Sequence, residues 1–99
     1  MAEREPDFHP EASSEAIEAY AWYFERDPGA AVAFDSELDR SLRRALDFPE
    51  AGRPSLYGTR ATRLSNFPFH LIYRPSGPVL RVIAVAHTSR RPGYWRGRL

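Results

Sequence analysis

The sequence predicts an α+β fold in which an N-terminal antiparallel helix hairpin packs on a small, mostly antiparallel sheet of three to four strands, followed by a basic C-terminal tail. Apolar residues recur with the 3.6-residue period of a helix across residues 10–48, and strand-like alternation follows across residues 59–87. Clusters of Pro and Gly separate these segments, as turns require. The chain has 99 residues, so we expect residues 1–99 to form a single domain.

The first helix is expected to begin at Pro10 and to end near Asp27. Proline suits the first turn of a helix, whereas Pro28 disfavours helical geometry in the residue before it. Trp22 falls on the charged face of this helix. Five apolar residues share its predicted core face: Ala12, Ala16, Tyr20, Tyr23 and Phe24.

The second helix is expected over residues 30–48. Because the corner before it is so short, the two helices should pack as an antiparallel hairpin. Six apolar residues form its predicted core stripe: Ala31, Phe34, Leu38, Leu42, Ala45 and Leu46.

Three strands are expected, at residues 59–65, 67–74 and 79–87. A turn at residues 75–78 should join the second to the third. The third strand is apolar on both faces, which is typical of a central strand. Simple alternation along it places Arg81 and His87 on the same face as Ile83 and Val85.

The charges divide the chain into two halves of opposite sign. Residues 1–50 carry all 13 acidic residues and 5 of the 14 basic ones, a net charge of −8. Residues 51–99 carry the other 9 basic residues, all arginine, and no carboxylate side chain, a net charge of +9. A positive surface of this kind attracts nucleic acid or an acidic protein segment.

Composition excludes or disfavours several classes of protein. The chain has no cysteine, so it has no disulfide, thiolate metal site or cysteine nucleophile. Its longest apolar run is the six residues 19–24, against roughly 20 for a membrane span. Residues 1–11 lack the apolar stretch of a signal peptide. We therefore expect a cytoplasmic protein with no metal, no cofactor and no membrane partner.

Several short strings resemble those of a known family. They are Phe8-His9-Pro10-Glu11-Ala12, Pro49-Glu50-Ala51-Gly52, Arg63-Leu64 with Phe67-Pro68-Phe69 and Tyr73, and Ala86-His87 with Arg90-Arg91-Pro92-Gly93-Tyr94-Trp95-Arg96. In this order, over residues 8–98, they resemble the RelE/ParE family of bacterial type II toxins, and its ParE-like, plasmid-stabilisation members in particular. Such proteins usually begin with an apolar strand. Residues 1–7 contain almost nothing apolar, so we expect that edge strand to be short or absent.

The resemblance implies a growth-inhibiting toxin that a co-produced antitoxin holds inactive in a hetero-oligomer. It leaves two activities open. RelE-like members enter the ribosome and cut messenger RNA, whereas ParE-like members poison DNA gyrase.

Nuclease chemistry would place narrow demands on this sequence. Metal-free RNA cleavage needs a general base, cations for the charge that develops on phosphorus, and a general acid. Arginine stays protonated, so the base is restricted to His70, His87, a tyrosine or Glu50. We rank His87 first because histidine is the residue type whose ordinary pKa lies near neutrality and because this one ends a central strand, although such a histidine is also typical of a hydrogen-bonded structural residue. His70 is expected at the rim. The nuclease set is then His87, Arg63, Arg81 and Tyr94.

A binding function would use a broader surface. Eight residues are predicted to contact the target or the antitoxin: Arg60, Arg63, Arg74, Arg90, Arg91, Tyr94, Trp95 and Arg96. The alternative for the tail arginines is a solvated tail, but this half of the chain contains no acid to pair with them, which favours binding. Trp95 is also expected to anchor the tail on the core. Trp22 either lies beside the second helix or serves as a docking residue.

We favour a ParE-like toxin that poisons DNA gyrase by binding, because the second half of the chain lacks both lysine and carboxylate. The alternatives are a ribosome-dependent messenger-RNA endonuclease and an inactive relic that only binds its antitoxin. An acidic antitoxin segment is expected to fold on the residues from Arg60 onward.

Overall fold

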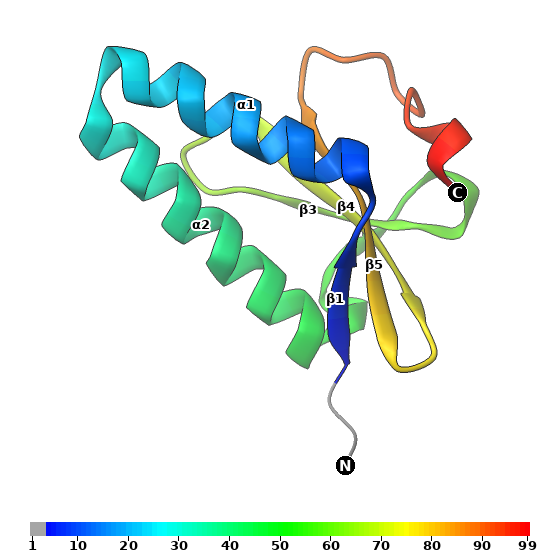
Figure 1. The fold of residues 1–99 in the computed structure, drawn as a ribbon. Coiled ribbons are helices and arrows are strands. Elements are labelled where there is room, and N and C mark those ends of the chain that lie inside the picture. The colour runs from blue at the N-terminus through cyan, green and yellow to red at the C-terminus, as the bar shows by residue number, and fades with distance from the viewer. Residues whose placement is uncertain (1–3) are drawn as a thin grey trace.

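The computed structural model describes residues 4–99 and places two helices on one face of a five-stranded sheet (Figure 1). The strands are β1 (Glu5–Phe8), β2 (Arg53–Pro54), β3 (Arg60–Arg63), β4 (Phe69–Ser76) and β5 (Val79–His87). Their order across the sheet is β1-β5-β4-β3-β2, with β1 parallel to β5 and the other pairs antiparallel. The predicted α+β class is confirmed. The strand count exceeds the predicted three to four because short strands, β1 and β2, form both edges.

The first edge strand is present and short. It contains Glu5, Pro6 and Asp7, so hydropathy does not mark it. Backbone pairing holds it: the Glu5 amide donates to the Pro78 carbonyl at 3.0 Å, and the amide of His9, just past β1, donates to the Val82 carbonyl at 2.9 Å. Residues 1–3 of the predicted polar segment lie outside the described residues.

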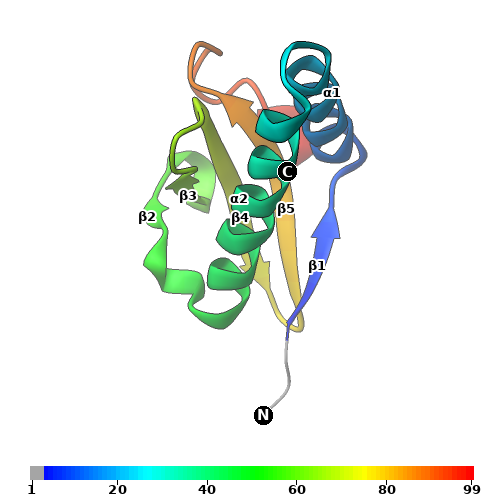
Figure 2. The same ribbon diagram turned by 90° about the vertical axis from the view of Figure 1, so that its left-hand side faces the viewer.

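A single aspartate separates the helices α1 (Pro10–Arg26) and α2 (Pro28–Asp47). The Asp27 amide donates to the Tyr23 carbonyl at 2.7 Å and ends α1, while its carboxylate accepts from the Gly29 amide at 3.0 Å and caps α2. At the start of α1, Nδ1 of His9 accepts from the Glu11 amide at 3.1 Å. The predicted antiparallel hairpin is therefore confirmed, and Figure 2 shows both helices on the same side of the sheet.

The main core lies between the helices and the sheet. Phe34 of α2 is buried at its centre, and its ring packs 5.3–5.5 Å from the rings of Tyr23, Phe67 and Phe69. The strands and Leu64, which follows β3, contribute further buried side chains to this core: Leu64, Leu71, Tyr73, Leu80, Val82 and Val85.

The predicted core face of α1 is partly wrong. Ala12 and Ala19 are buried and Tyr23 packs on the core, but Phe24 is 52% exposed and stacks on Tyr20 at 6.1 Å. Small alanine side chains let α1 lie close to the sheet. The buried stripe of α1 therefore runs through Ala12, Ala19 and Tyr23. Phe24, one position after Tyr23, points outward. Trp22 is exposed, as predicted.

A β-bulge in β5 changes which residues share a face. Ile72 lies opposite Ala84 while Tyr73 lies opposite Val82, so Ile83 is an extra residue. The predicted common face for Arg81, Ile83, Val85 and His87 is therefore wrong: Ile83 packs on the face away from the helices, whereas Val85 belongs to the helix-covered core. β4 also continues through Pro75 and Ser76, where a turn was predicted. The turn itself is at Gly77, with φ of 60°.

The face of the sheet away from the helices is the open face, and the C-terminal tail, residues 88–99, covers part of it. Trp95 is buried there, with Tyr94 beside it, on the side chains of Ala61, Ile72, Ile83, Ala84 and Ala86. The ring of Tyr57 packs edge-on against Trp95 at 5.9 Å. This second, smaller core explains why β5 is apolar on both faces, and it confirms Trp95 as the anchor of the tail.

Candidate functional site

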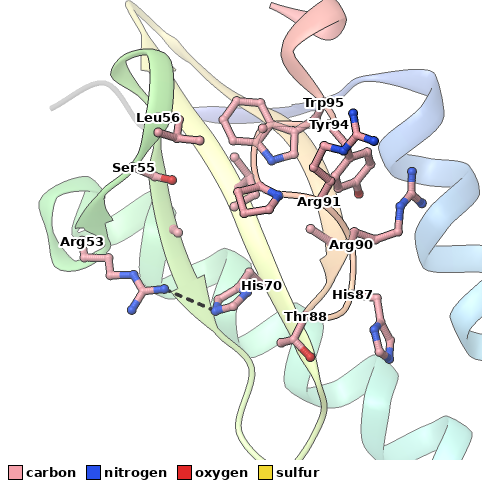
Figure 3. Close-up of a pocket in the computed structure, with 15 residues that line it drawn as sticks. Arg53, Ser55, Leu56, His70, His87, Thr88, Arg90, Arg91, Tyr94 and Trp95 are labelled. Atoms are coloured by element: carbon pink, nitrogen blue, oxygen red, sulfur yellow. Dashed lines mark hydrogen bonds between the residues drawn. The ribbon is translucent and has the colours of Figure 1, made fainter.

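A groove of about 320 Å³ lies on the open face between the tail and the segment that carries β2 (Figure 3). Its apolar surface comes from Ala61, Ile72, Ala86 and Trp95. Arg53 stands on the β2 side, and Arg90 and Arg91 stand on the tail side. Among the described residues that line it, none is acidic. The groove therefore combines an apolar floor with a cationic rim, a combination suited to an anionic ligand.

Glu15 of α1 fixes the tail that forms one wall of the groove. Its carboxylate accepts hydrogen bonds from the Val85 amide at 3.0 Å, from the Tyr94 hydroxyl, and from both terminal nitrogens of Arg98 at 2.8 and 3.0 Å. The side chains of Arg98 and Glu15 are only 10% and 14% exposed. The expectation that the tail has no acid partner is therefore wrong, because α1 supplies one.

This contact also changes the chemistry of the tail. The hydrogen bond to Glu15 raises the pKa of Arg98. Burial, followed by the bond to Glu15, raises the pKa of Tyr94 well above its ordinary value. Arg90 covers the ring of Tyr94 at 3.8 Å. Tyr94 is thus a weak acid committed to Glu15, which makes it poorly suited to protonate a leaving group.

The two histidines that ranked as candidate bases have different surroundings. Nδ1 of His87 accepts from the Ser89 amide at 3.0 Å and lies 2.8 Å from the Ser89 hydroxyl, and the His87 ring packs edge-on against Phe69 at 5.1 Å. His87 therefore holds the turn after β5. Both histidines line the groove, and Nε2 of His70 lies 3.4 Å from a terminal nitrogen of Arg53. Burial, together with Arg53 and Arg63, lowers the pKa of His70.

The structure brings only part of the predicted nuclease set together: His87 and Tyr94 line the groove, whereas Arg63 and Arg81 do not. Arg81 lies opposite Arg74 near one end of β5, and His87 lies at the other end, opposite Phe69. The six residue steps from Arg81 to His87 correspond to about 20 Å of strand. Since the bulge also turns Arg81 and His87 to opposite faces, the two residues do not share a site.

The residues of the predicted binding set are distributed over the open face and its margins. Arg60 donates to the Gly52 carbonyl at 2.7 Å, and Arg63 donates to the Phe67 carbonyl at 3.3 Å, so each supports a loop. Arg96 lies 5.0 Å from the centre of the Tyr57 ring. Arg74 lines a separate cavity near Arg4. Only Arg90, Arg91, Tyr94 and Trp95 of the set line the groove, and Trp95, 3% exposed, serves mainly as its floor.

Two important residues were not identified from the sequence. Arg53 lies in a stretch expected to be a loop, and nothing in its neighbours marks it. Glu15 did carry a signal: it lies three residues after Ala12 and four before Ala19, on the buried stripe of α1. A carboxylate at such a position needs a partner, which here comes from the tail.

Comparisons with known proteins agree with this architecture. The family model described as ParE toxin of the type II toxin–antitoxin system parDE matches residues 7–92. A solved structure described as the chromosomal ParDE toxin–antitoxin system from P. aeruginosa is similar with a TM-score of 0.78. It is 17% identical, and the match covers 90% of this chain and 100% of that one, a likeness that shows the fold. A comparison with curated proteins finds no match.

No helix within residues 4–99 is long and apolar enough to cross a membrane. In the same range, no group of three or more metal-binding side chains comes together. Because the family model spans most of its length, the chain belongs to the ParE toxin family of type II toxin–antitoxin systems.

Proposed function

We propose that this chain acts in the cytoplasm, as a single domain, and stops growth by binding and poisoning DNA gyrase. The proposal rests on one observation: the candidate acid–base side chains are already hydrogen-bonded within the protein, and they lie beside a cationic groove. The Tyr94 hydroxyl is committed to Glu15, and the His87 ring is held by Ser89. Arg90 and Arg91 meanwhile line an open groove without a carboxylate. Such a surface favours binding over catalysis.

We further infer that a cognate antitoxin neutralises the toxin in a hetero-oligomer by laying an acidic, partly apolar segment on the open face. Opposite charge on the two partners speeds their encounter, so the association rate should fall as salt rises. An antitoxin that contacts only residues before Arg60, or that associates at a rate indifferent to salt, would contradict this inference.

One observation favours the alternative of a messenger-RNA endonuclease. His70 lies beside Arg53 in the groove, and its lowered pKa favours the neutral form that a general base requires. In that alternative the base is His70 rather than His87.

The experiment compares matched variants in a bacterial growth assay. We expect the triple change Arg90→Gln, Arg91→Gln and Arg96→Gln to abolish growth inhibition, whereas His87→Ala should retain it. The control removes the same charge from exposed positions of α2, as Arg40→Gln, Arg43→Gln and Arg44→Gln, and should remain toxic. Circular dichroism and antitoxin binding show whether each variant folds.

Two biochemical readouts identify the target. The wild-type chain should stop DNA synthesis before protein synthesis and should increase the cleaved-DNA complex of purified gyrase. If the chain instead cuts messenger RNA on purified ribosomes, and His70→Gln does not, the endonuclease alternative replaces the proposal. If the wild-type chain has no effect on growth but still binds its antitoxin, it is an inactive relic.

A further inference from the structure

A second pocket lies between α1 and the neighbouring ends of β4 and β5. Its volume is about 340 Å³, within the roughly 300–1,000 Å³ typical of pockets for small ligands. Glu18, Trp22 and Tyr23 line its helix side, and Phe69 and His87, which lie opposite each other in the sheet, line the other side. We call it the aromatic pocket. His87 also lines the groove on the open face, so the two sites adjoin.

The spacing along α1 places the helix residues of this pocket on one face. Glu18 and Trp22 are four residues apart, and so are Ala19 and Tyr23. Ala19 is buried and lines the pocket, where its small side chain leaves the space open. Trp22 is 52% exposed, and it forms a wall of the pocket rather than an isolated surface ring.

The protein core fixes two of the rings that form the walls. The Tyr23 ring packs edge-on against Phe67 at 5.2 Å, and the Phe69 ring packs 5.3 Å from the ring of Phe34. Trp22 packs edge-on against Tyr23 at 5.1 Å. A ligand therefore meets rings that are already positioned, which lowers the entropy cost of binding.

The faces of aromatic rings attract cations, because their π electrons give each face a negative partial charge. Trp22 shows this attraction within the chain, since the guanidinium of Arg26 lies 3.7 Å from the centre of its ring. Arg26 does not line the pocket, and Glu25, at 3.9 Å, offsets its charge. The rings that line the pocket are therefore available to a second cation.

A carboxylate adds to this attraction. Glu18 lines the pocket and forms no ion pair within residues 4–99. None of the described residues that line the pocket is an arginine. The groove has the opposite character, with Arg53, Arg90 and Arg91 at its rim. Two adjoining sites on this chain therefore favour ligands of opposite charge.

An arginine side chain fits the aromatic pocket better than the alternatives do. Glu18 would repel a phosphate or an acidic peptide, and a purely apolar side chain would shield this carboxylate from water without pairing it. The planar guanidinium of arginine stacks on aromatic rings and pairs with a carboxylate through two N–H groups. The ammonium group of lysine is a compact, strongly hydrated charge that cannot stack in this way.

We propose that the aromatic pocket binds an arginine side chain of a partner protein, with the guanidinium against the rings of Trp22 and Phe69 and paired with Glu18. Free arginine also carries a carboxylate, for which the pocket supplies no arginine or lysine partner. This docking point goes beyond the proposed action on gyrase. It selects a charge opposite to that of the acidic antitoxin segment expected on the open face.

The test is an NMR titration of the purified full-length chain with N-acetyl-arginine amide, whose blocked ends imitate a residue within a protein. The backbone amide signals of Trp22, Tyr23 and Phe69 should shift and saturate. N-acetyl-citrulline amide has nearly the same shape without the charge, so it should bind roughly fivefold more weakly or worse. The corresponding lysine and leucine probes should also bind more weakly.

Three results of this titration overturn the proposal. They are equal binding of the citrulline, lysine or leucine probe, tighter binding of unblocked arginine, and absence of shifts at Trp22, Tyr23 and Phe69. Neither gyrase nor antitoxin is present, so failure here is separable from failure of the proposed function in the growth assay.

A matched pair of charge variants locates the site. Glu18→Gln should weaken binding of the arginine probe by roughly threefold or more, since it removes a charged hydrogen-bond acceptor. Glu50→Gln makes the same change just beyond the C-terminal end of α2 and should alter affinity by less than about 1.5-fold, as expected for a screened distant charge. Equal effects of the two variants would mean non-specific attraction and would contradict the site.

A matched pair of ring variants tests the stacking. Trp22 and Phe24 are both 52% exposed, but Phe24 does not line the pocket. Trp22→Ala should weaken binding by roughly fivefold or more because a stacking surface is lost. Phe24→Ala should leave the affinity nearly unchanged. The dispersion of the amide signals shows whether each variant folds, and equal affinity of the two folded variants overturns the proposal.

Discussion

The two faces of the sheet are buried in different ways. On the helix-covered face, Phe34 and its neighbouring rings interlock, and two helices exclude water along most of the strands. On the open face one large side chain, Trp95, is buried, and a groove remains beside it. The helix-covered face therefore supplies most of the stability, whereas the open face carries the candidate binding groove. Substitutions should therefore separate the two properties.

The largest expected effect is on the helix-covered face. Phe34→Ala removes a ring that is 1% exposed, so it should lower the free energy of unfolding by about 3–5 kcal/mol. Trp22→Ala removes a larger side chain that is 52% exposed, and it should cost less than about 1 kcal/mol. Urea denaturation followed by circular dichroism measures both. If Trp22→Ala proves the more damaging change, the assignment of α1 faces is wrong.

An intermediate effect is expected where the tail is attached. Glu15→Gln removes the partly buried counter-charge that accepts from both terminal nitrogens of Arg98, so it should lower the free energy of unfolding by about 1–3 kcal/mol. Glu11→Gln is the matched control. Glu11 is 68% exposed and lies 3.5 Å from Arg98, and an exposed pair contributes less than about 1 kcal/mol.

The same pair of variants sharpens the comparison of the two faces. In a Trp22→Phe background, the fluorescence of Trp95 reports the open face alone. Glu15→Gln should shift this emission toward that of an exposed indole before the helices unfold, and Glu11→Gln should not. Simultaneous loss of both signals would show that the tail and the helix-covered core are one cooperative unit.

The smallest effect concerns pH. The pKa of His70 is lowered in the folded chain by burial and by Arg53 and Arg63, so protonation favours the unfolded state. Its contribution to stability is complete above the ordinary pKa near 6.5 and is lost as the pH falls through the lower folded-state value. Wild type should therefore lose more stability than His70→Gln between pH 7 and pH 5. His87→Gln serves as the control, and equal pH dependence of wild type and His70→Gln would contradict the assignment.

Sequence periodicity predicted the helices and strands that are determined by residues close together in the chain. The bounds of both helices, and all of β5, lie within about two residues of expectation because Pro10, Pro28 and the alternation of apolar residues act over a single turn or strand pair. β1 was harder to predict because its four residues are held by backbone bonds to β5 rather than by an apolar pattern.

Features of the site depended on tertiary contacts that no local pattern encodes. The bulge at Ile83 exists only in the pairing of β5 with β4, and it reversed the faces assigned to Val85 and His87. The choice between His70 and His87 depended on their partners, since Ser89 holds the ring of His87 whereas His70 lies beside Arg53. Arg53 enters the groove because β2 pairs with β3, a contact of two residues that hydropathy cannot show. The basic tail and its aromatic anchor, in contrast, were visible in composition.

The contact between Glu15 and Arg98 joins residues 83 positions apart in the chain. Contacts of such long separation close late in folding, after the helix hairpin and the strand pairs that are near in sequence. During synthesis, α1 and the strands also emerge before the tail. We therefore expect the wall of the groove to form late in folding. A nascent or partly folded chain would carry the helices and sheet while its cationic surface is still incomplete, a delay in which an antitoxin could reach the chain before it becomes active.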